Sequence, residues 1–134
     1  MTVQMSLSRI FIREMTDLQF IELEEVGGGR AFPIVIGLTE AMAIERRLKG
    51  RVPPRPQTHD LLATAIDQLG GTLERIVIHT LKENTFFAKL IVTQDGKEIE
   101  IDSRPSDAIA IAAGTDIPIY VDESVLEEAG PEDG

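Results

Sequence analysis

The sequence predicts an α+β fold: a single compact domain, a mostly antiparallel or mixed β-sheet of about six to seven strands, and three to four helices. The chain has 134 residues, of which 43% are hydrophobic, and these values fit one domain with one core. Segments with alternating apolar residues are interleaved with stretches of helical periodicity, and glycine or proline separates them. We expect the domain to span residues 1–129, followed by a disordered tail at 130–134.

Three strands are predicted at the start of the chain. Residues 3–13 alternate, but their apolar positions change face near Arg9, which predicts a bulge or bend. Strands at 18–24 and 31–36 follow, joined by a turn of three glycines. Pro33 cannot donate a ladder hydrogen bond, so its strand is expected at an edge of the sheet.

Two helices are predicted next. Thr39 is expected to cap a helix at 40–49, and the prolines of residues 51–57 predict a stiff loop after it. A second helix is expected to begin near Thr58. The apolar stripe of this helix, which is expected to face the core, consists of Leu61, Leu62, Ala65, Ile66 and Leu69.

Three further strands are predicted at residues 73–81, 85–93 and 97–102. An Asp-Gly pair between the second and the third is a strong hairpin signal. Ile99 and Ile101 alternate in the third of these strands and are expected to face inward.

The remaining elements are a helix, a strand and a short helix. Residues 105–113 predict the first helix, and residues 108–113 are all alanine or isoleucine, so we expect it to be buried on most sides. A strand at 117–121 follows. Asp122 is expected to cap the last helix, which ends at Ala129.

Composition excludes several classes of protein. The chain has no cysteine, which excludes disulfides and thiolate zinc sites. No apolar run approaches the roughly 20 residues that a membrane-spanning helix needs. Residues 1–8 alternate and lack the basic start and apolar run of a signal peptide. We therefore expect a soluble cytoplasmic protein with no membrane partner.

Charge is unevenly distributed along the chain. The net charge of −10 should repel nucleic acid from the molecule as a whole. A basic stretch interrupts this pattern and contains Arg46, Arg47, Lys49, Arg51 and Arg55. One interpretation is a solvated helix end, because basic side chains are favoured near a helix C-terminus. The other is a local patch that faces phosphate groups.

The most informative feature is a short sequence similarity between two predicted helix starts. Residues 55–60 read Arg-Pro-Gln-Thr-His-Asp, and residues 104–107 read Arg-Pro-Ser-Asp directly after Ile-Asp-Ser. Both place an arginine and a proline just ahead of a carboxylate in a first helical turn. A structural interpretation suffices for each alone, because proline and aspartate favour helix starts and an arginine–aspartate ion pair could form within either segment.

The functional interpretation uses the same physics. A helix N-terminus offers free N–H groups, and arginine adds a bidentate fork, so Arg55 and Arg104 are candidates for holding phosphate. His59 is a candidate general acid or base near neutral pH. Carboxylates suit Mg²⁺ or Mn²⁺, and we expect such an ion at Asp102 and Asp107. The candidate catalytic residues are His59, Asp60, Asp102 and Asp107.

At these residues the sequence resembles the bifunctional nuclease domain family of bacteria and plants, formerly a domain of unknown function. Residues 55–62 look like its first motif, residues 102–112 look like its longer second motif, and the order of elements is similar from about residue 3 to 127. The resemblance implies an α+β fold, a bacterial nuclease (DNase and RNase), and a homo-oligomer, with a dimer favoured.

The resemblance also implies a set of site residues. The positions that match the two motifs are Arg55, Thr58, His59, Asp60, Asp102, Ser103, Arg104, Ser106 and Asp107. Among them, Thr58, Ser103 and Ser106 join the two arginines as phosphate-binding candidates. The leading hypothesis is therefore a metal-assisted hydrolase of nucleic acid. The alternatives are a non-enzymatic oligomeric interaction or regulatory module and a binder of a small anionic ligand.

Overall fold

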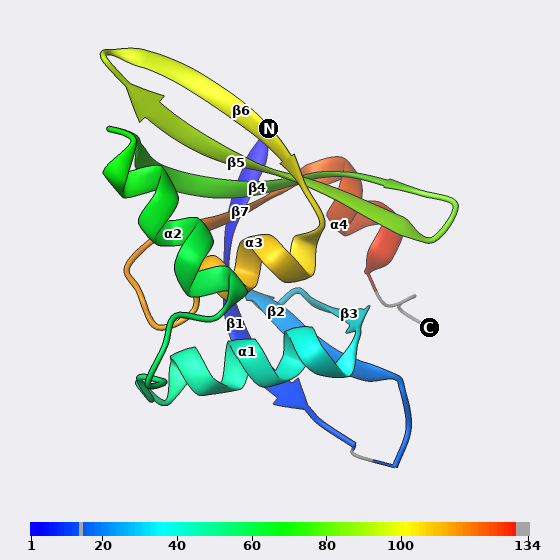
Figure 1. The fold of residues 1–134 in the computed structure, drawn as a ribbon. Coiled ribbons are helices and arrows are strands. Elements are labelled where there is room, and N and C mark those ends of the chain that lie inside the picture. The colour runs from blue at the N-terminus through cyan, green and yellow to red at the C-terminus, as the bar shows by residue number, and fades with distance from the viewer. Residues whose placement is uncertain (14, 131–134) are drawn as a thin grey trace.

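Seven strands form one mixed sheet in the order β3-β2-β1-β7-β4-β5-β6, and four helices pack around it (Figure 1). The computed structural model describes residues 1–13 and 15–130. The strands are β1 (Thr2–Phe11), β2 (Gln19–Glu25), β3 (Ala31–Ile36), β4 (Thr72–Lys82), β5 (Thr85–Gln94), β6 (Lys97–Ser103) and β7 (Ile119–Asp122). The helices are α1 (Leu38–Leu48), α2 (Thr58–Gln68), α3 (Pro105–Ala112) and α4 (Glu123–Ala129). The pairs are antiparallel except for β4 with β7, which confirms the predicted α+β class.

The first three strands follow the predicted pattern. The register between β1 and β2 shifts between Leu7 and Arg9, so the predicted bulge is confirmed. Strand β3 lies at one end of the sheet, which confirms the edge position expected from Pro33. Alternation places Ile21 and Phe32 in the core, where they are almost completely buried.

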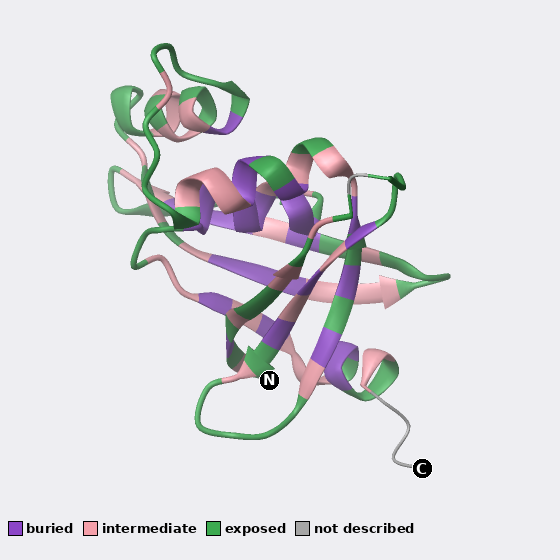
Figure 2. Cartoon of the chain, turned by 90° about the horizontal axis from the view of Figure 1, so that it is seen from below, coloured by how far each residue is buried: buried purple, intermediate pink, exposed green. Residues whose placement is uncertain are grey.

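Helix α3 lies at the centre of the molecule. It packs against α1 and α2 on one side and against β4 and β5 on the other. All of its alanines and isoleucines are buried, as the uninterrupted apolar run predicted (Figure 2). This burial fixes the position of its N-terminal turn, which carries Arg104 at the N-cap and Asp107 in the first turn.

Helix α1 starts earlier than predicted. Its N-cap is Gly37, and Thr39 lies inside the first turn, so the assignment of Thr39 as the cap was wrong. The side chain of Glu40 folds back over Gly37: a Cβ placed there would lie 2.5 Å from Oε1 of Glu40. Glycine thus leaves space that a larger cap residue would fill, and this close approach is not visible in the sequence pattern.

Helix α2 departs most from its prediction. Only part of its predicted apolar stripe faces the core: Ile66 packs against it, whereas Leu61 is 60% exposed and Leu69 is 75% exposed. The one buried residue of this helix is His59. The helix therefore packs on α3 and β4 through His59, Ala63 and Ile66.

The predicted burial of two β6 residues was also wrong. Ile99 and Ile101 pair with the buried Val92 and Leu90 of β5, but each is 39% exposed. Cross-strand partners share a face of the sheet, so both isoleucines point to the side predicted. They stay uncovered because β6 is the last strand of the sheet.

The C-terminal helix begins as predicted. The Asp122 side chain caps α4 by accepting a hydrogen bond from the Ser124 backbone N–H at 3.1 Å. Of the tail expected to be disordered, residues 131–134 lie outside the described residues. None of the helices in the described part of the chain is both long and apolar enough to cross a membrane.

Candidate functional site

The two predicted helix starts meet in the structure. The Nε2 atom of His59, in the first turn of α2, lies 2.9 Å from Oδ1 of Asp107 in the first turn of α3. Arg104 holds the same carboxylate with two donors, Nε to Oδ2 at 2.9 Å and Nη2 to Oδ1 at 3.1 Å. Its Nη2 also donates to Oε2 of Glu40 at 3.0 Å. We call these four residues, His59, Asp107, Arg104 and Glu40, the α3 cluster.

The hydrogen bonds of the α3 cluster set its charge state. Burial alone would raise the pKa of Asp107, but donation from Arg104 and His59 outweighs it and holds that pKa below its usual value. Because Asp107 is ionised near neutral pH, the His59 proton belongs on Nε2, and Nδ1 of a neutral ring is free to accept. The dyad therefore consists of an ionised carboxylate and an imidazole joined by a hydrogen bond.

A cavity of about 420 Å³ lies beside the start of α3. Its lining includes Arg104, Pro105 and Ser106 from the start of α3, together with Gly37 and Thr85. The Arg104 side chain is 64% exposed, and its Nη1 makes no hydrogen bond to the described residues. This arginine can therefore contact a phosphate group without first breaking its bonds to Asp107.

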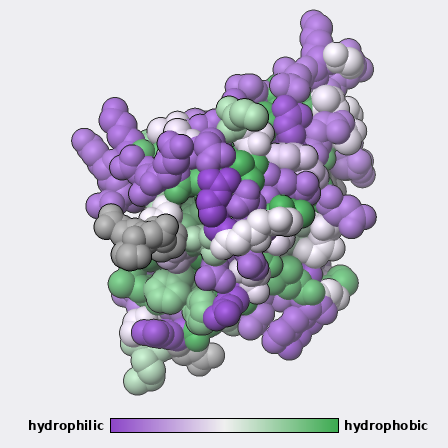
Figure 3. All heavy atoms as spheres, turned by 180° about the vertical axis from the view of Figure 1, so that it is seen from behind, coloured by the Kyte–Doolittle hydropathy of each residue, from purple (hydrophilic) through white to green (hydrophobic). Residues whose placement is uncertain are grey.

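Asp102 is not brought to the α3 cluster. Along β6 successive side chains alternate between faces, so Asp102 lies opposite to Ile101 and on the same face as Glu100. That face carries an ion pair between Lys89 and Glu100 at 3.1 Å. Seen from behind the view of Figure 1, hydrophilic atoms predominate over the upper half of the molecule (Figure 3).

The described residues do not form a ready metal site. Within residues 1–13 and 15–130, no three or more His, Cys, Asp or Glu side chains are grouped so that they could hold an ion. The two expected ligands lie on different elements, Asp102 on β6 and Asp107 on α3.

The other phosphate-binding candidates are distributed around these helix starts. Ser106 is buried and lines the cavity beside α3, whereas the Ser103 hydroxyl donates to the backbone oxygen of Arg104 at 2.7 Å. Arg55 and Thr58 are exposed before and at the start of α2, and neither lines that cavity. Of the phosphate-binding candidates, Arg104 and Ser106 thus share one cavity.

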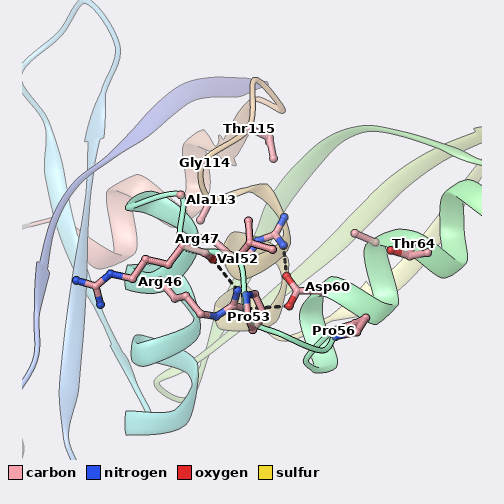
Figure 4. A pocket seen from close by; sticks show the side chains of 13 residues that line it. Arg46, Arg47, Val52, Pro53, Pro56, Asp60, Thr64, Ala113, Gly114 and Thr115 are labelled. Carbon is pink, nitrogen blue, oxygen red and sulfur yellow. Dashed lines mark hydrogen bonds and ion pairs between the residues drawn. The ribbon is translucent and has the colours of Figure 1, made fainter.

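Asp60 belongs to a second ionic cluster. Its Oδ2 accepts from Nη2 of Arg46 at 3.0 Å and its Oδ1 from Nη1 of Arg47 at 2.6 Å (Figure 4). It also accepts from the backbone N–H of Gln57 at 2.9 Å and so forms a capping box. Arg55 does not pair with Asp60, so an ion pair within that segment is not formed.

The same bonds fix the charge of Asp60. Burial opposes ionisation, but the backbone N–H of Gln57 and the guanidinium groups of Arg47 and Arg46 together lower the pKa of Asp60. Asp60 thus connects the start of α2 to the end of α1. The preceding residue, His59, connects the same turn of α2 to α3.

Two parts of this arrangement are not evident from the sequence. Glu40 has the ordinary position of an acidic residue in a first helical turn, so nothing distinguished it as a partner of Arg104. The basic stretch that contains Arg46 and Arg47 was the available signal for the second cluster. The stretch did not indicate which carboxylate those arginines would contact.

Comparison with known proteins relates the chain to a family. The model of a family described as "Bifunctional nuclease domain" matches residues 21–133. "Uncharacterized protein Rv1829" of Mycobacterium tuberculosis is 46% identical over 108 residues, which cover 81% of this chain and 64% of that protein. "Bifunctional nuclease 1" of Oryza sativa subsp. indica is 25% identical over 109 residues, or 79% of this chain and 33% of that protein. "Bifunctional nuclease 2" of Arabidopsis thaliana is 26% identical with the same coverage.

The chain is similar to only part of each of these relatives. It spans 64% of the length of the mycobacterial protein and a third of the length of the plant nucleases. The matched region includes both helix starts of the site, since the family match runs from β2 through α4.

Proposed function

This chain belongs to the bifunctional nuclease domain family, and from that premise we propose that it hydrolyses phosphodiester bonds in DNA or RNA at the start of α3. The observation that carries the proposal is the α3 cluster, in which an exposed arginine, an ionised carboxylate and an imidazole are joined by hydrogen bonds. The plant relatives bear the name bifunctional nuclease, which supports the same class of activity.

Three residues of the cluster have distinct proposed roles. Arg104 holds a non-bridging phosphate oxygen through its free Nη1 and neutralises charge that develops there. Asp107 orients both Arg104 and His59. His59 accepts a proton through Nδ1 from the attacking water, or returns one to the leaving oxygen.

Metal dependence is a separate prediction. Mg²⁺ or Mn²⁺ suits phosphodiester hydrolysis, but the described residues do not form a preassembled group of three ligands. No step proposed above depends on an ion. Cleavage in Mg²⁺, in Mn²⁺ and in EDTA measures this dependence directly.

Asp107→Asn is expected to reduce cleavage of DNA or RNA by about 100-fold, because it removes the ionised partner of both His59 and Arg104. The measurement is the initial rate on single- and double-stranded substrates, with circular dichroism to verify folding. A contaminating nuclease would be unaffected by the substitution.

Asp102→Asn is the matched comparison. Asp102 is also an aspartate, but it lies on β6, on the face opposite to that of Ile101. We expect it to keep near wild-type activity. Loss in Asp102→Asn with activity retained in Asp107→Asn would place the reaction on the other face of the sheet. Absence of cleavage by the wild-type protein under all conditions would contradict the nuclease proposal itself and favour a non-enzymatic module.

The expected homodimer also finds support in the structure. Leu61 and Leu69 of α2 are exposed, and Gln94 at the end of β5 donates to the Leu69 backbone oxygen at 2.7 Å, so this end of α2 lies beside the β5–β6 turn. Ile99 and Ile101 extend the apolar surface along an edge strand, whose unpaired backbone groups favour contact with another chain. We propose a dimer through α2 and β6.

Leu69→Lys is expected to weaken this dimer at least tenfold, because it places a charge in an apolar contact. Light scattering across a range of protein concentrations measures the dissociation constant. Val35→Lys on the opposite edge strand β3 is the control, since Val35 is also exposed, at 58%. An equal effect of both substitutions would exclude α2 as the interface.

A further inference from the structure

We propose that a second cavity, separate from the α3 cluster, binds a small organic phosphate: a ligand with one phosphate group and a largely apolar body. The cavity has a volume of about 570 Å³ and lies between the end of α1, the proline-rich loop and α2 (Figure 4). This size is in the range of cavities that hold small organic ligands. We call it the arginine cavity after Arg46, Arg47 and Arg51, which line it together with Asp60.

The charge of the arginine cavity predicts an anionic ligand. Three arginines line it with a single carboxylate, that of Asp60, and this carboxylate pairs with Arg46 and Arg47. Arg51 forms no ion pair with the described residues. The lining thus keeps a charge of +2 in a chain whose net charge is −10. A phosphate dianion would balance this excess, whereas a single carboxylate would leave half of it.

The hydrogen-bond donors of the two paired arginines lead to the same conclusion. Each guanidinium has five N–H groups. Arg46 donates to Asp60 and to the Arg51 backbone oxygen, and Arg47 donates to Asp60 and to the Ile111 backbone oxygen. Each arginine thus uses two of its five N–H groups, and because both Nε atoms are buried, the donors left for a ligand are those on the Nη atoms.

This surplus of donors is unusual for side chains that are only 15% and 17% exposed. The single carboxylate already receives Arg46, Arg47 and the Gln57 backbone N–H, so at most one of its roughly four acceptor sites is left for the remaining donors. A phosphate group brings several acceptor oxygens and is the group for which arginine forks are best suited.

The rest of the lining suits the body of such a ligand. Val52, Pro53 and Pro56 come from the loop between α1 and α2, Ala63 comes from α2, and Ala113 directly follows α3. Val52 is 90% exposed, so an apolar ring placed against it would remove surface from water. A nucleoside monophosphate combines these features, and we choose adenosine 5′-monophosphate as the probe.

The inference is independent of the proposed nuclease reaction. Arg104 and Ser106 line the cavity beside α3, and neither of them lines the arginine cavity. One connection between the two sites runs through α2, where Asp60 accepts from the arginines and the preceding His59 contacts Asp107.

The test is isothermal titration of the full chain with adenosine 5′-monophosphate, inorganic phosphate and adenosine. We expect saturable binding of the monophosphate, and binding at least tenfold weaker for each of the two fragments, because each lacks half of the contacts. Arg51→Gln is expected to weaken binding of the monophosphate at least tenfold, since it removes charged donors from the lining. Arg51 forms no ion pair with the described residues, so this substitution should not disturb the fold.

Lys49→Gln is the matched control. It removes one positive charge from the same basic stretch, but Lys49 does not line the cavity and pairs with Glu45 instead. Binding should change less than twofold. Equal losses in both variants, or no saturable binding of the monophosphate or of phosphate at millimolar concentration, would overturn the proposal.

A third variant distinguishes the two sites. Arg104→Gln should leave binding of the monophosphate unchanged, because Arg104 lies at the start of α3 and not in the arginine cavity. Loss of binding in this variant would assign the ligand to the nuclease site and overturn the inference without affecting the proposed reaction. Conversely, absence of nuclease activity with intact monophosphate binding would leave the arginine cavity supported.

Discussion

Asp60→Asn is expected to lower the free energy of unfolding by about 3 kcal/mol, because it leaves two mostly buried guanidinium groups without a counter-ion. The side chains of Asp60, Arg46 and Arg47 are 18%, 15% and 17% exposed, so the loss falls at the lower end of the range for buried pairs. Urea denaturation followed by circular dichroism measures the change. A loss below about 1 kcal/mol would contradict the ionic contact between α1 and α2.

Asp67→Asn is the control for this substitution. Asp67 lies on the same helix, is exposed and forms no side-chain hydrogen bond or ion pair with the described residues. Its replacement should change stability by no more than about 0.5 kcal/mol.

The sign of the pH dependence follows from the direction of the pKa shifts. The pKa of Asp60 and that of Asp107 are both lowered in the folded protein. A carboxyl group of this kind stabilises the fold above its unfolded pKa, which is about 4, and loses that contribution as the pH falls through its folded pKa. The unfolding free energy should therefore decrease below about pH 4, and Asp60→Asn should reduce the size of this decrease.

Gly114→Ala is expected to destabilise the protein by about 3 kcal/mol. Gly114 follows α3 with a φ of +76°, and a Cβ at this position would lie 2.4 Å from the backbone oxygen of Arg47 at the end of α1. Left-handed backbone costs a non-glycine residue about 1–2 kcal/mol, and separating two packed helices adds a similar amount. Thermal and urea denaturation measure the loss.

Gly96→Ala separates the two contributions. Gly96 has a φ of +77° in the β5–β6 turn, but a Cβ there would meet nothing within 4 Å. Its replacement should therefore cost only the backbone term, about 1 kcal/mol. If the two glycine substitutions cost the same, the close approach of α1 to the end of α3 would be excluded.

Much of the fold could be predicted from local patterns, because alternation and turn residues act over short distances. The bulge near Arg9, the edge position of Pro33 and the burial of the alanine and isoleucine run in α3 all follow from such patterns. The pattern did not reveal that the leucines in the apolar stripe of α2 and the isoleucines of β6 would remain uncovered. Periodicity identifies an apolar face, but it does not say whether another element covers that face.

The site was predictable to a smaller extent. The two motifs drew attention to the starts of α2 and α3, and these meet through His59 and Asp107. Sequence spacing did not separate His59 from Asp60, although adjacent residues of a helix point about 100° apart and contact different partners. The second motif has the same property: successive residues of β6 alternate between faces, so the adjacent Asp102 and Ser103 point to opposite sides of the sheet.

The exposed stripe of α2 has a consequence for the stability of the two ionic clusters. His59 is the one fully buried residue of α2, and Ala63 and Ile66 add partly buried contacts, whereas Leu61 and Leu62 are exposed. Detachment of this helix would therefore expose less apolar surface than opening of the core, and such segments open more easily. Opening would remove His59 and Asp60 together, so the α3 cluster and the arginine cavity would be lost in one event. A second chain that covers the stripe would oppose this opening by mass action. The abundance of the protein would then set the fraction of molecules in which both clusters are assembled.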